Sequence, residues 1–218
     1  MEGVFVTGTG TEVGKTVVAA AIARTLASEG KRVAVFKPAV TGLDEAGEPD
    51  HAILRRAAGS TQTDEEIAPY RYGPPMSPHL AAELAGEEID PERLPAAARE
   101  AAAGADTLVC EGVGGLMVPL SPSYLVRDLA VDLALPLVVA ASPALGTINH
   151  TLLTIEAART AGLEVAAVVL TPWPDVPSTV EESNRSTIST LGDVQVETLP
   201  RLDPASANSW PRLALHQD

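Results

Sequence analysis

The sequence has a single cysteine, few aromatic residues and no long hydrophobic run. Cys110 cannot form an intramolecular disulfide on its own, and the histidines and the cysteine lack the spacing of a zinc site. The longest apolar run, residues 133–141, is far shorter than the roughly 20 residues that a membrane-spanning helix needs. The first residues, Met-Glu-Gly, lack the positive charge that opens a signal peptide. These features predict a cytoplasmic protein that does not associate with a membrane.

Basic residues are also scarce. The chain carries 15 lysines and arginines against 29 aspartates and glutamates, which gives a formal net charge of −14. A general nucleic-acid binder needs the opposite sign, because it must neutralise the phosphate backbone. We therefore expect no nucleic-acid partner. Any anionic ligand must be held locally, by oriented backbone amides, a few lysines or a metal ion.

What the sequence does contain is a regular alternation of short apolar runs with alanine-rich segments of helical length. Its 218 residues, 45% of them hydrophobic, suffice for one domain with a core, so we assign residues 1–218 to a single domain that ends in a poorly structured tail, 206–218. Strands that are apolar throughout indicate a sheet covered on both faces. The sequence thus predicts an α/β fold with a doubly wound, mostly parallel sheet and helices on both faces. The predicted strands are residues 3–7, 32–36, 107–110, 136–141, 165–170 and 194–198; the predicted helices are 16–28, 50–58, 79–85, 92–103, 126–134, 147–161 and 179–191; residues 60–78 are predicted as loop.

The most specific local signal lies between the first strand and the first helix, where the chain reads Gly-Thr-Gly-Thr-Glu-Val-Gly-Lys-Thr at positions 8–16. A glycine-rich turn here lets successive amides surround a phosphate, with the helix N-terminus behind them. Lys15 can reach the β- and γ-phosphates, and the Thr16 hydroxyl can bind Mg²⁺. Five residues separate Gly8 from Gly14, where the common motif has four, so the loop is a variant. An ordinary glycine-rich turn is the alternative, but the position between strand and helix favours nucleotide binding. The candidate nucleotide-contacting residues of this segment are Gly8, Thr11, Glu12, Val13, Gly14, Lys15, Thr16 and Val17.

Polar side chains follow two other predicted strands, at the sheet edge where ligands bind in open parallel sheets. Lys37 comes directly after the second strand and Thr41 follows it, while Glu111 ends a buried strand and precedes a Gly-Val-Gly-Gly turn. Oxygen ligands suit Mg²⁺, so Thr16, Asp50 and Glu111 are candidate metal ligands. Two alternatives remain open: Lys37 could be a surface residue with a buried stem, and Asp50 could cap its helix.

Four segments carry a family resemblance. They are Val-Thr-Gly-Thr-Gly-Thr-Glu-Val-Gly-Lys-Thr at 6–16, Lys-Pro-Ala-Val-Thr-Gly at 37–42, Glu-Gly-Val-Gly-Gly at 111–115 and Leu-Gly-Thr-Ile-Asn-His-Thr at 145–151. In this order and spacing they resemble the dethiobiotin synthetases of biotin biosynthesis. The resemblance implies a P-loop NTPase-like fold and an ATP- and Mg²⁺-dependent ligase. It implies that 7,8-diaminopelargonate takes up CO₂ as a carbamate, which is phosphorylated to a carbamic-phosphoric anhydride and closes to the ureido ring with release of ADP and phosphate.

The resemblance also implies roles for particular residues. Lys15, Lys37 and Thr41 would be catalytic, with Lys37 and Thr41 contacting the substrate. Family members are homodimers with substrate at the interface, so the segment 146–149 would bind the substrate carboxylate of the neighbouring subunit's site; the alternative is that Asn149 only caps its helix. Beyond the glycine-rich segment, the resemblance implies that the nucleotide is contacted by Asp50, Glu111, Gly112, Val113 and Gly114. It implies that the substrate carboxylate is bound by Gly146, Thr147, Ile148 and Asn149.

The base-recognition region departs from the family pattern. Many members place an asparagine after the strand at 165–170, where this chain has Thr171, Pro172 and Trp173. Trp173 either stacks on the base or packs its own loop, so another nucleoside triphosphate could serve as well as ATP. A second base-contacting loop would fall at Leu199, Pro200 and Arg201.

Two other classes of protein share the predicted architecture. A ParA/MinD-like switch ATPase would have this sheet and a variant phosphate loop, but usually carries a further lysine early in the loop, where this chain has threonine or glutamate. A small-molecule kinase is closer in chemistry. A GTPase is disfavoured because the sequence lacks an Asn-Lys-x-Asp guanine motif.

Overall fold

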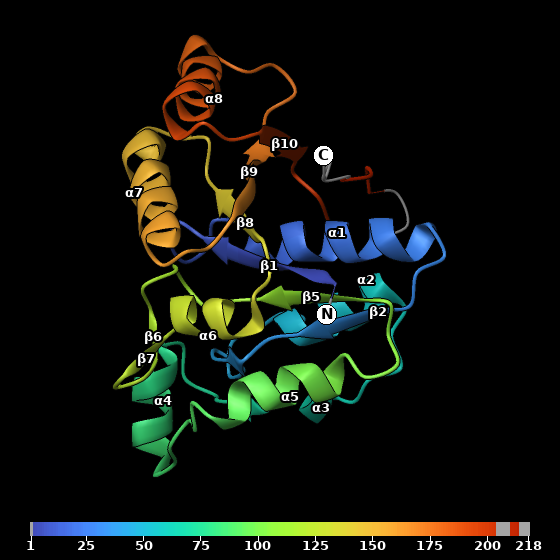
Figure 1. Cartoon of the computed structure of the whole chain (residues 1–218). Coiled ribbons are helices and arrows are strands. Elements are labelled where there is room, and N and C mark those ends of the chain that lie inside the picture. Colours follow the sequence, from blue (N-terminus) through green and yellow to red (C-terminus); the bar gives the residue numbers. More distant parts are fainter. Residues whose placement is uncertain (1, 204–209, 214–218) are drawn as a thin grey trace.

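The centre of the protein is a six-stranded parallel sheet with the strand order β10-β9-β8-β1-β5-β2 (Figure 1). The structure is a computed structural model that describes residues 2–203 and 210–213. The chain starts in the middle of the sheet and adds strands on both sides of β1, so the predicted doubly wound fold is confirmed. The strands are β1 (Gly3–Gly8), β2 (Val33–Phe36), β5 (Thr107–Glu111), β8 (Leu137–Ala141), β9 (Val165–Trp173) and β10 (Val196–Pro200).

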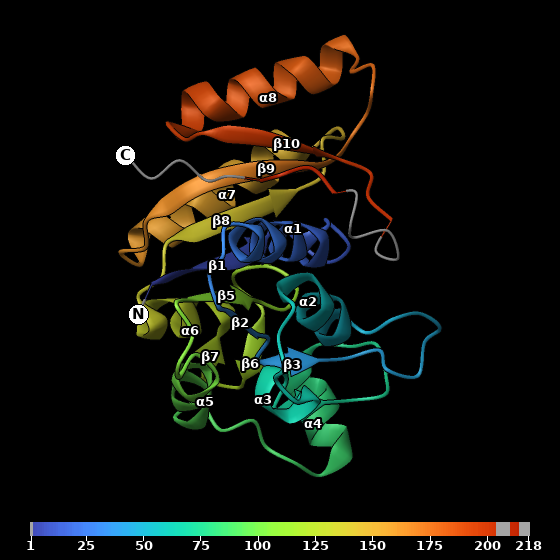
Figure 2. The same cartoon turned by 90° about the vertical axis from the view of Figure 1, so that its right-hand side faces the viewer.

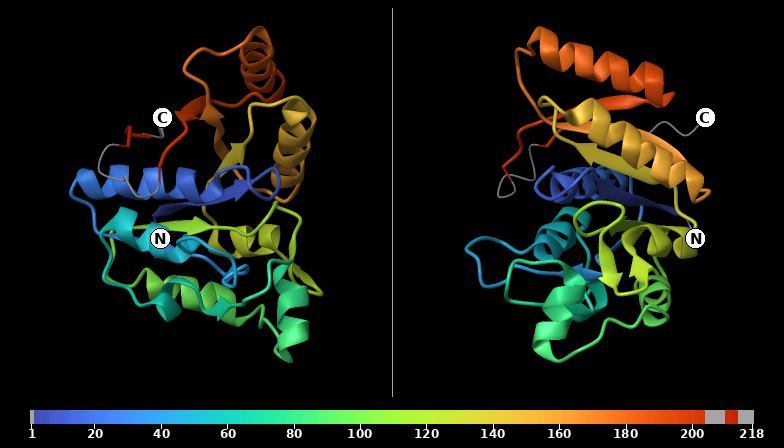
Figure 3. Two further views of the ribbon diagram at one scale, coloured as in Figure 1. Left: turned by 180° about the vertical axis from the view of Figure 1, so that it is seen from behind. Right: turned by 90° about the vertical axis from the view of Figure 1, so that its left-hand side faces the viewer.

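Helices cover both faces of this sheet, because most of its side chains are apolar on both sides. Helices α1 and α2 lie together on one face (Figure 2), and α5, α6 and α7 lie on the other (Figure 3). Helix α8 packs against α7 near the β10 edge. The helices are α1 (Lys15–Ser28), α2 (Asp50–Ala58), α3 (Asp64–Ile67), α4 (Pro78–Ala85), α5 (Arg93–Ala101), α6 (Val126–Leu133), α7 (Thr147–Thr160) and α8 (Thr179–Gly192). No helix within the described residues is both long and apolar enough to cross a membrane.

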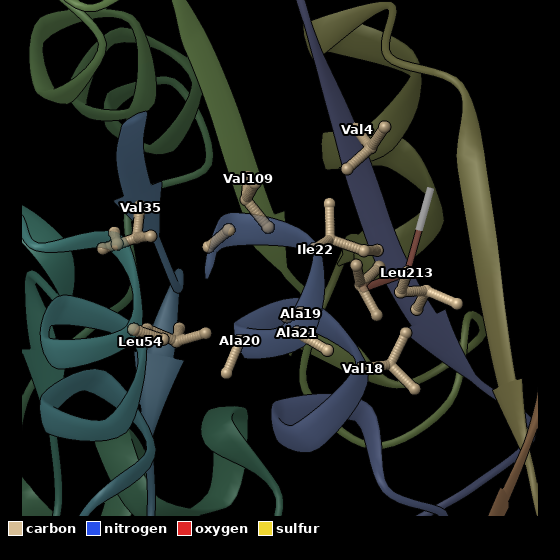
Figure 4. Close-up of a cluster of buried hydrophobic side chains, with 14 of the residues drawn as sticks. Val4, Val18, Ala19, Ala20, Ala21, Ile22, Val35, Leu54, Val109 and Leu213 are labelled. Carbon is tan, nitrogen blue, oxygen red and sulfur yellow. The ribbon is translucent and has the colours of Figure 1, made fainter. Parts of the chain in front are cut away.

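Helix α1 packs closely on the sheet through small side chains. Ala19, Ala20 and Ala21 are completely buried, and Figure 4 shows this helix between Leu54 of α2 on one side and Val4 and Leu213 on the other. The segment 8–16, which we call the phosphate loop, runs directly into α1, so the tight packing of this helix holds the loop at a fixed position over the sheet.

Four residues of the predicted tail, 210–213, lie within the described part of the chain. Trp210 and Leu213 are buried against α1 and the neighbouring strands. The Leu213 amide donates a hydrogen bond of 3.0 Å to the Thr25 hydroxyl, and the Trp210 indole donates one of 2.9 Å to the Asp203 carbonyl. These apolar side chains bury surface that α1 would otherwise expose, which stabilises the segment. The rest of the predicted tail, 206–209 and 214–218, lies outside the described residues.

The segment 60–78 was predicted as loop, and this is wrong for two short elements. Helix α3 begins with a capping box formed by Thr63 and Glu66, and β4 (Tyr70–Arg71) pairs with β3 (Ala39–Val40). A small antiparallel pair, β6 (Pro119–Ser121) and β7 (Tyr124–Leu125), was also missed. Elements of two to four residues are too short to show a hydrophobic period.

Candidate functional site

A cavity of about 770 Å³ opens beyond the carboxyl ends of β1, β2 and β5. The phosphate loop forms its floor, and the segment from Thr41 to Asp50 forms one wall. This is the position at which open parallel sheets bind their ligands.

Two glycines allow other segments to approach the phosphate loop closely. Gly14 has a φ of 87°, and a Cβ atom there would lie 2.5 Å from the methyl group of Thr171. A Cβ atom at Gly115 would lie 3.4 Å from the Gly8 carbonyl, so the turn after β5 rests directly on the loop. The Lys15 ammonium donates a hydrogen bond of 2.7 Å to the Gly10 carbonyl, and burial lowers the pKa of Lys15. The loop is thus enclosed by segments distant in sequence.

Four predicted residues meet at one point beside the loop. The Lys37 ammonium lies 2.6 Å from Oε1 of Glu111 and 2.9 Å from Oδ2 of Asp50. The Thr16 hydroxyl donates a hydrogen bond of 2.8 Å to the same Oε1 atom of Glu111. Burial alone would lower the pKa of Lys37, but the carboxylates of Glu111 and Asp50 outweigh it and raise this pKa. Burial would raise the pKa of Asp50, but the Lys37 ammonium outweighs burial, so the pKa of Asp50 is lowered. The lysine therefore stays charged and is aimed into the cavity.

The backbone fixes these side chains. Lys37 directly follows β2, and its amide donates a hydrogen bond of 2.8 Å to the carbonyl of Ile67 at the end of α3. The lysine side chain is only 3% exposed, so the alternative of a surface lysine is wrong. Pro49 occupies the N-cap of α2, with Asp50 as the first helical residue, so the alternative of Asp50 as a helix cap is also wrong.

The donor set fits a divalent metal that is shared with a nucleotide. Oε2 of Glu111 is buried and has no hydrogen-bond partner, in a side chain that is 0% exposed. Mg²⁺ prefers such carboxylate and hydroxyl oxygens and usually keeps waters and phosphate oxygens as its other ligands. In the part of the chain that the structure describes, no group of three or more acidic, histidine or cysteine side chains forms a metal cage of its own. Thr16, Asp50 and Glu111 can therefore hold Mg²⁺ only together with further ligands such as phosphates.

Most of the predicted nucleotide and substrate residues lie around this cavity. Gly8 ends β1 at the start of the loop, where a Cβ atom would meet Val13 and Lys15 at 2.7 Å and 2.9 Å. Gly112 belongs to the turn that follows Glu111, and its carbonyl lies 3.5 Å from the Lys37 ammonium. The predicted residues that line the cavity are Thr11, Glu12, Gly14, Lys15, Thr16, Val17, Lys37, Thr41, Asp50, Glu111, Val113 and Gly114.

The predicted base-contacting residues do not line the cavity. The first group lies inside β9 instead of after it, because this strand runs to Trp173. Trp173 packs against the apolar cluster beneath α7 and α8, and Leu199 is buried in the cluster around α1. Thr171 is in close contact with the loop, through Gly14. Pro172, Pro200 and Arg201 are exposed near the same strand ends.

The segment 146–149 also lies outside the cavity lining of its own chain. Gly146 is the N-cap of α7, with a φ of 95°, and Thr147 is buried. Asn149 is exposed inside the first turn and makes no capping hydrogen bond, so the alternative of a helix cap is wrong. The neighbouring Leu145 is 92% exposed. The start of α7 is therefore open to a binding partner outside its own cavity.

An apolar wall of the cavity was missed by the sequence reasoning. Leu43, Pro75, Met76 and Val118 line the cavity together with Lys37 and Thr41. They come from three separate loops, and a loop with prolines carries no periodic signal that marks one side chain as a ligand contact.

Comparison with known proteins identifies relatives over most of the chain. A family model described as an AAA domain matches residues 2–207. The chain is 44% identical over 193 residues to an ATP-dependent dethiobiotin synthetase of Anaeromyxobacter dehalogenans, with 86% of each chain covered. It is 33% identical over 217 residues to the ATP-dependent dethiobiotin synthetase of Bacillus subtilis, with 99% of this chain and 93% of the relative covered. In structure it is similar to a ParA family ATPase from Chlorobium tepidum, with a TM-score of 0.57 at 12% identity over 93% of this chain and 86% of that one.

Proposed function

The chain belongs to the dethiobiotin synthetase family, and from this premise we propose that it carboxylates 7,8-diaminopelargonate with CO₂ and closes the ring to dethiobiotin at the expense of ATP. The observation that carries the proposal is the position of Lys37, held by Asp50 and Glu111 next to Thr16 of the phosphate loop. A charged lysine at this point can reach both a phosphate that is bound to the loop and the substrate group in the cavity that accepts the phosphoryl group.

The residues have distinct roles in this proposal. The amides of the loop and Lys15 bind the β- and γ-phosphates. Thr16, Asp50 and Glu111 would hold Mg²⁺, which would neutralise part of the phosphate charge. Phosphorylation of a carbamate brings two anions together, and Lys37 lowers the free energy of this encounter by stabilising the charge of both. Thr41 hydrogen-bonds the substrate. The second amine then attacks the activated carbon and phosphate leaves.

The apolar wall suits the rest of the substrate. Diaminopelargonate carries its two neighbouring amines at one end and its carboxylate at the other, with an aliphatic chain between the two ends. Contact with Met76 and Val118 would remove part of that chain from water. We propose that the carboxylate at its far end reaches the amides of Thr147, Ile148 and Asn149 of a second copy of the chain, since a helix N-terminus attracts anions. A homodimer with the substrate at its interface follows from this arrangement, and sedimentation velocity tests it.

The reaction is tested with purified protein, diaminopelargonate, ¹³C-bicarbonate, Mg²⁺ and each nucleoside triphosphate in turn, with mass spectrometry as the readout. We expect a product that carries one labelled carbon and that depends on the triphosphate. The same assay ranks the bases, which matters because Thr171, Pro172 and Trp173 replace the usual asparagine region. Slow triphosphate hydrolysis without product, whichever nucleotide is used, would contradict the proposal and favour a switch ATPase.

Gly14→Ala is expected to weaken ATP binding by about tenfold or more. The new methyl group would meet Thr171 at 2.5 Å, and at a φ of 87° the backbone is strained for any L-residue. Such strain costs about 1–3 kcal/mol, and about 1.4 kcal/mol equals a tenfold change in affinity. Isothermal titration calorimetry with a non-hydrolysable ATP analogue measures the effect.

Gly30→Ala is the matched control for this substitution. Gly30 has a similar φ of 85°, but a Cβ atom there has open space around it. Both variants should lose stability, whereas only Gly14→Ala should lose nucleotide affinity. A further change of Thr171 to serine removes the clashing methyl group and should recover part of that affinity. Equal affinity in both single variants would show that Gly14 is not part of the phosphate cradle.

A further inference from the structure

Asn184 is a buried polar residue in the middle of α8, a helix whose neighbouring positions are mostly exposed. Its side chain is 5% exposed, and its amide group donates a hydrogen bond of 2.9 Å to the carbonyl of Pro143 and one of 3.4 Å to that of Ala144. A buried amide costs free energy unless its hydrogen bonds are formed. These bonds therefore fix α8 to a segment 41 residues earlier in the chain.

The segment that Asn184 holds leads directly into α7. The Ala144 carbonyl also accepts a hydrogen bond of 3.2 Å from the amide of Thr147, the first residue of the helix. The Ala144 amide donates a hydrogen bond of 3.3 Å to the Ser142 hydroxyl. Ala144 thus links the Asn184 side chain to the first turn of α7.

Ile148 of this turn packs against the apolar cluster beneath α7 and α8, but the residues just before the helix are exposed. Three successive residues, Ala144, Leu145 and Gly146, are exposed, and Gly146 has the φ of 95° that only glycine adopts freely. An exposed loop that ends in glycine has many accessible conformations, so the hydrogen bonds to it act together with the packing of Ile148 to set the direction of the first amides of α7.

We propose that Asn184 is a positioning residue for the substrate carboxylate, through the segment 143–146 and the first turn of α7. The inference rests on the proposed function, in which the amides of Thr147, Ile148 and Asn149 bind that carboxylate. Asn184 does not contact the substrate in this arrangement. It holds the backbone amides of the first turn of α7 so that they point toward the carboxylate, as the residues behind a binding site generally do for the residues that contact the ligand.

The test compares Asn184→Ala and Asn184→Asp with the unchanged protein. Alanine removes the donor, and aspartate keeps the shape but turns an acceptor toward two carbonyl groups. Since one hydrogen bond contributes modestly, we expect the KM for diaminopelargonate to rise by about fivefold in the alanine variant and by more in the aspartate variant. The kcat and the KM for the nucleotide should stay within about twofold, because the phosphate loop is untouched.

Hydrogen exchange measured by mass spectrometry gives a readout that needs no substrate. The amides of 144–149 should exchange faster in both variants, while those of the phosphate loop keep their rates. Ser183→Ala, an exposed change on the same helix, is the matched control and should alter neither quantity.

Two results would overturn the inference. One is an unchanged KM for diaminopelargonate in active Asn184 variants. The other is a parallel change of kcat and both KM values together with a lower melting temperature, which indicates general destabilisation. If the unchanged protein forms no dethiobiotin, the proposed function fails separately, and unchanged exchange at 144–149 would then overturn the positioning role on its own.

Discussion

Lys37→Ala is expected to lower kcat by about 10²-fold or more, because removal of one group that stabilises transition-state charge has an effect of this size. The lysine is positioned by two carboxylates at 2.6 Å and 2.9 Å, so it loses little entropy when it meets the transferring phosphoryl group. The KM for the nucleotide should change much less than kcat, since the loop amides and Lys15 remain. Steady-state kinetics with diaminopelargonate, bicarbonate and Mg·ATP separates the two quantities.

The stability of this variant must be measured alongside its activity. Glu111 is completely buried, and removing one partner of a buried ion pair destabilises a protein by about 3–5 kcal/mol. Lys37→Gln retains a hydrogen-bond donor toward Glu111 and should therefore unfold at a higher temperature than Lys37→Ala while remaining as inactive. Lys31→Ala, an exposed lysine, is the control and should have normal kcat. Normal turnover in either folded Lys37 variant would remove the lysine from the reaction.

The cluster of polar residues around Lys37 could be predicted from the sequence because its positions follow from local rules. Lys37 and Glu111 each come at the carboxyl end of an apolar strand, and the ends of parallel strands meet at one edge of the sheet. The phosphate loop is likewise defined by its position between strand and helix. In these cases the hydrophobic pattern of the strand determines where the polar side chain will lie.

Other parts of the site depend on contacts that no local pattern records. The Lys37 amide is anchored by Ile67 of α3, a helix of four residues. Met76 reaches the cavity from a proline-containing loop, and Asn184 acts on a segment 41 residues away. In the sequence, Asn184 looks like an ordinary polar residue of an amphipathic helix. Tertiary packing alone determines which side chains of such segments are buried.

Glu111→Gln is expected to lower kcat by about 10²-fold and to raise the Mg²⁺ concentration needed for half-maximal activity by about tenfold or more. The glutamate uses Oε1 for both Lys37 and Thr16, which leaves the buried Oε2 without a partner. A glutamine can keep its oxygen toward Lys37 and Thr16 only by turning its NH₂ group to the position of Oε2. This replaces the oxygen that we propose as a Mg²⁺ ligand with a hydrogen-bond donor, which cannot bind Mg²⁺.

The metal dependence distinguishes this effect from a loss of fold. Glutamine has nearly the same volume as glutamate, so packing in the surrounding core is preserved, and circular dichroism should show an unchanged structure. Glu48→Gln removes a carboxylate from the rim of the same cavity, where Glu48 pairs with Arg56 at 2.6 Å in an exposed ion pair. Exposed pairs contribute little, so this control should keep both its kcat and its Mg²⁺ dependence. A Mg²⁺ requirement unchanged in Glu111→Gln would mean that the buried Oε2 is not a metal ligand, and the role of Glu111 would then be to hold Lys37 and Thr16 in place.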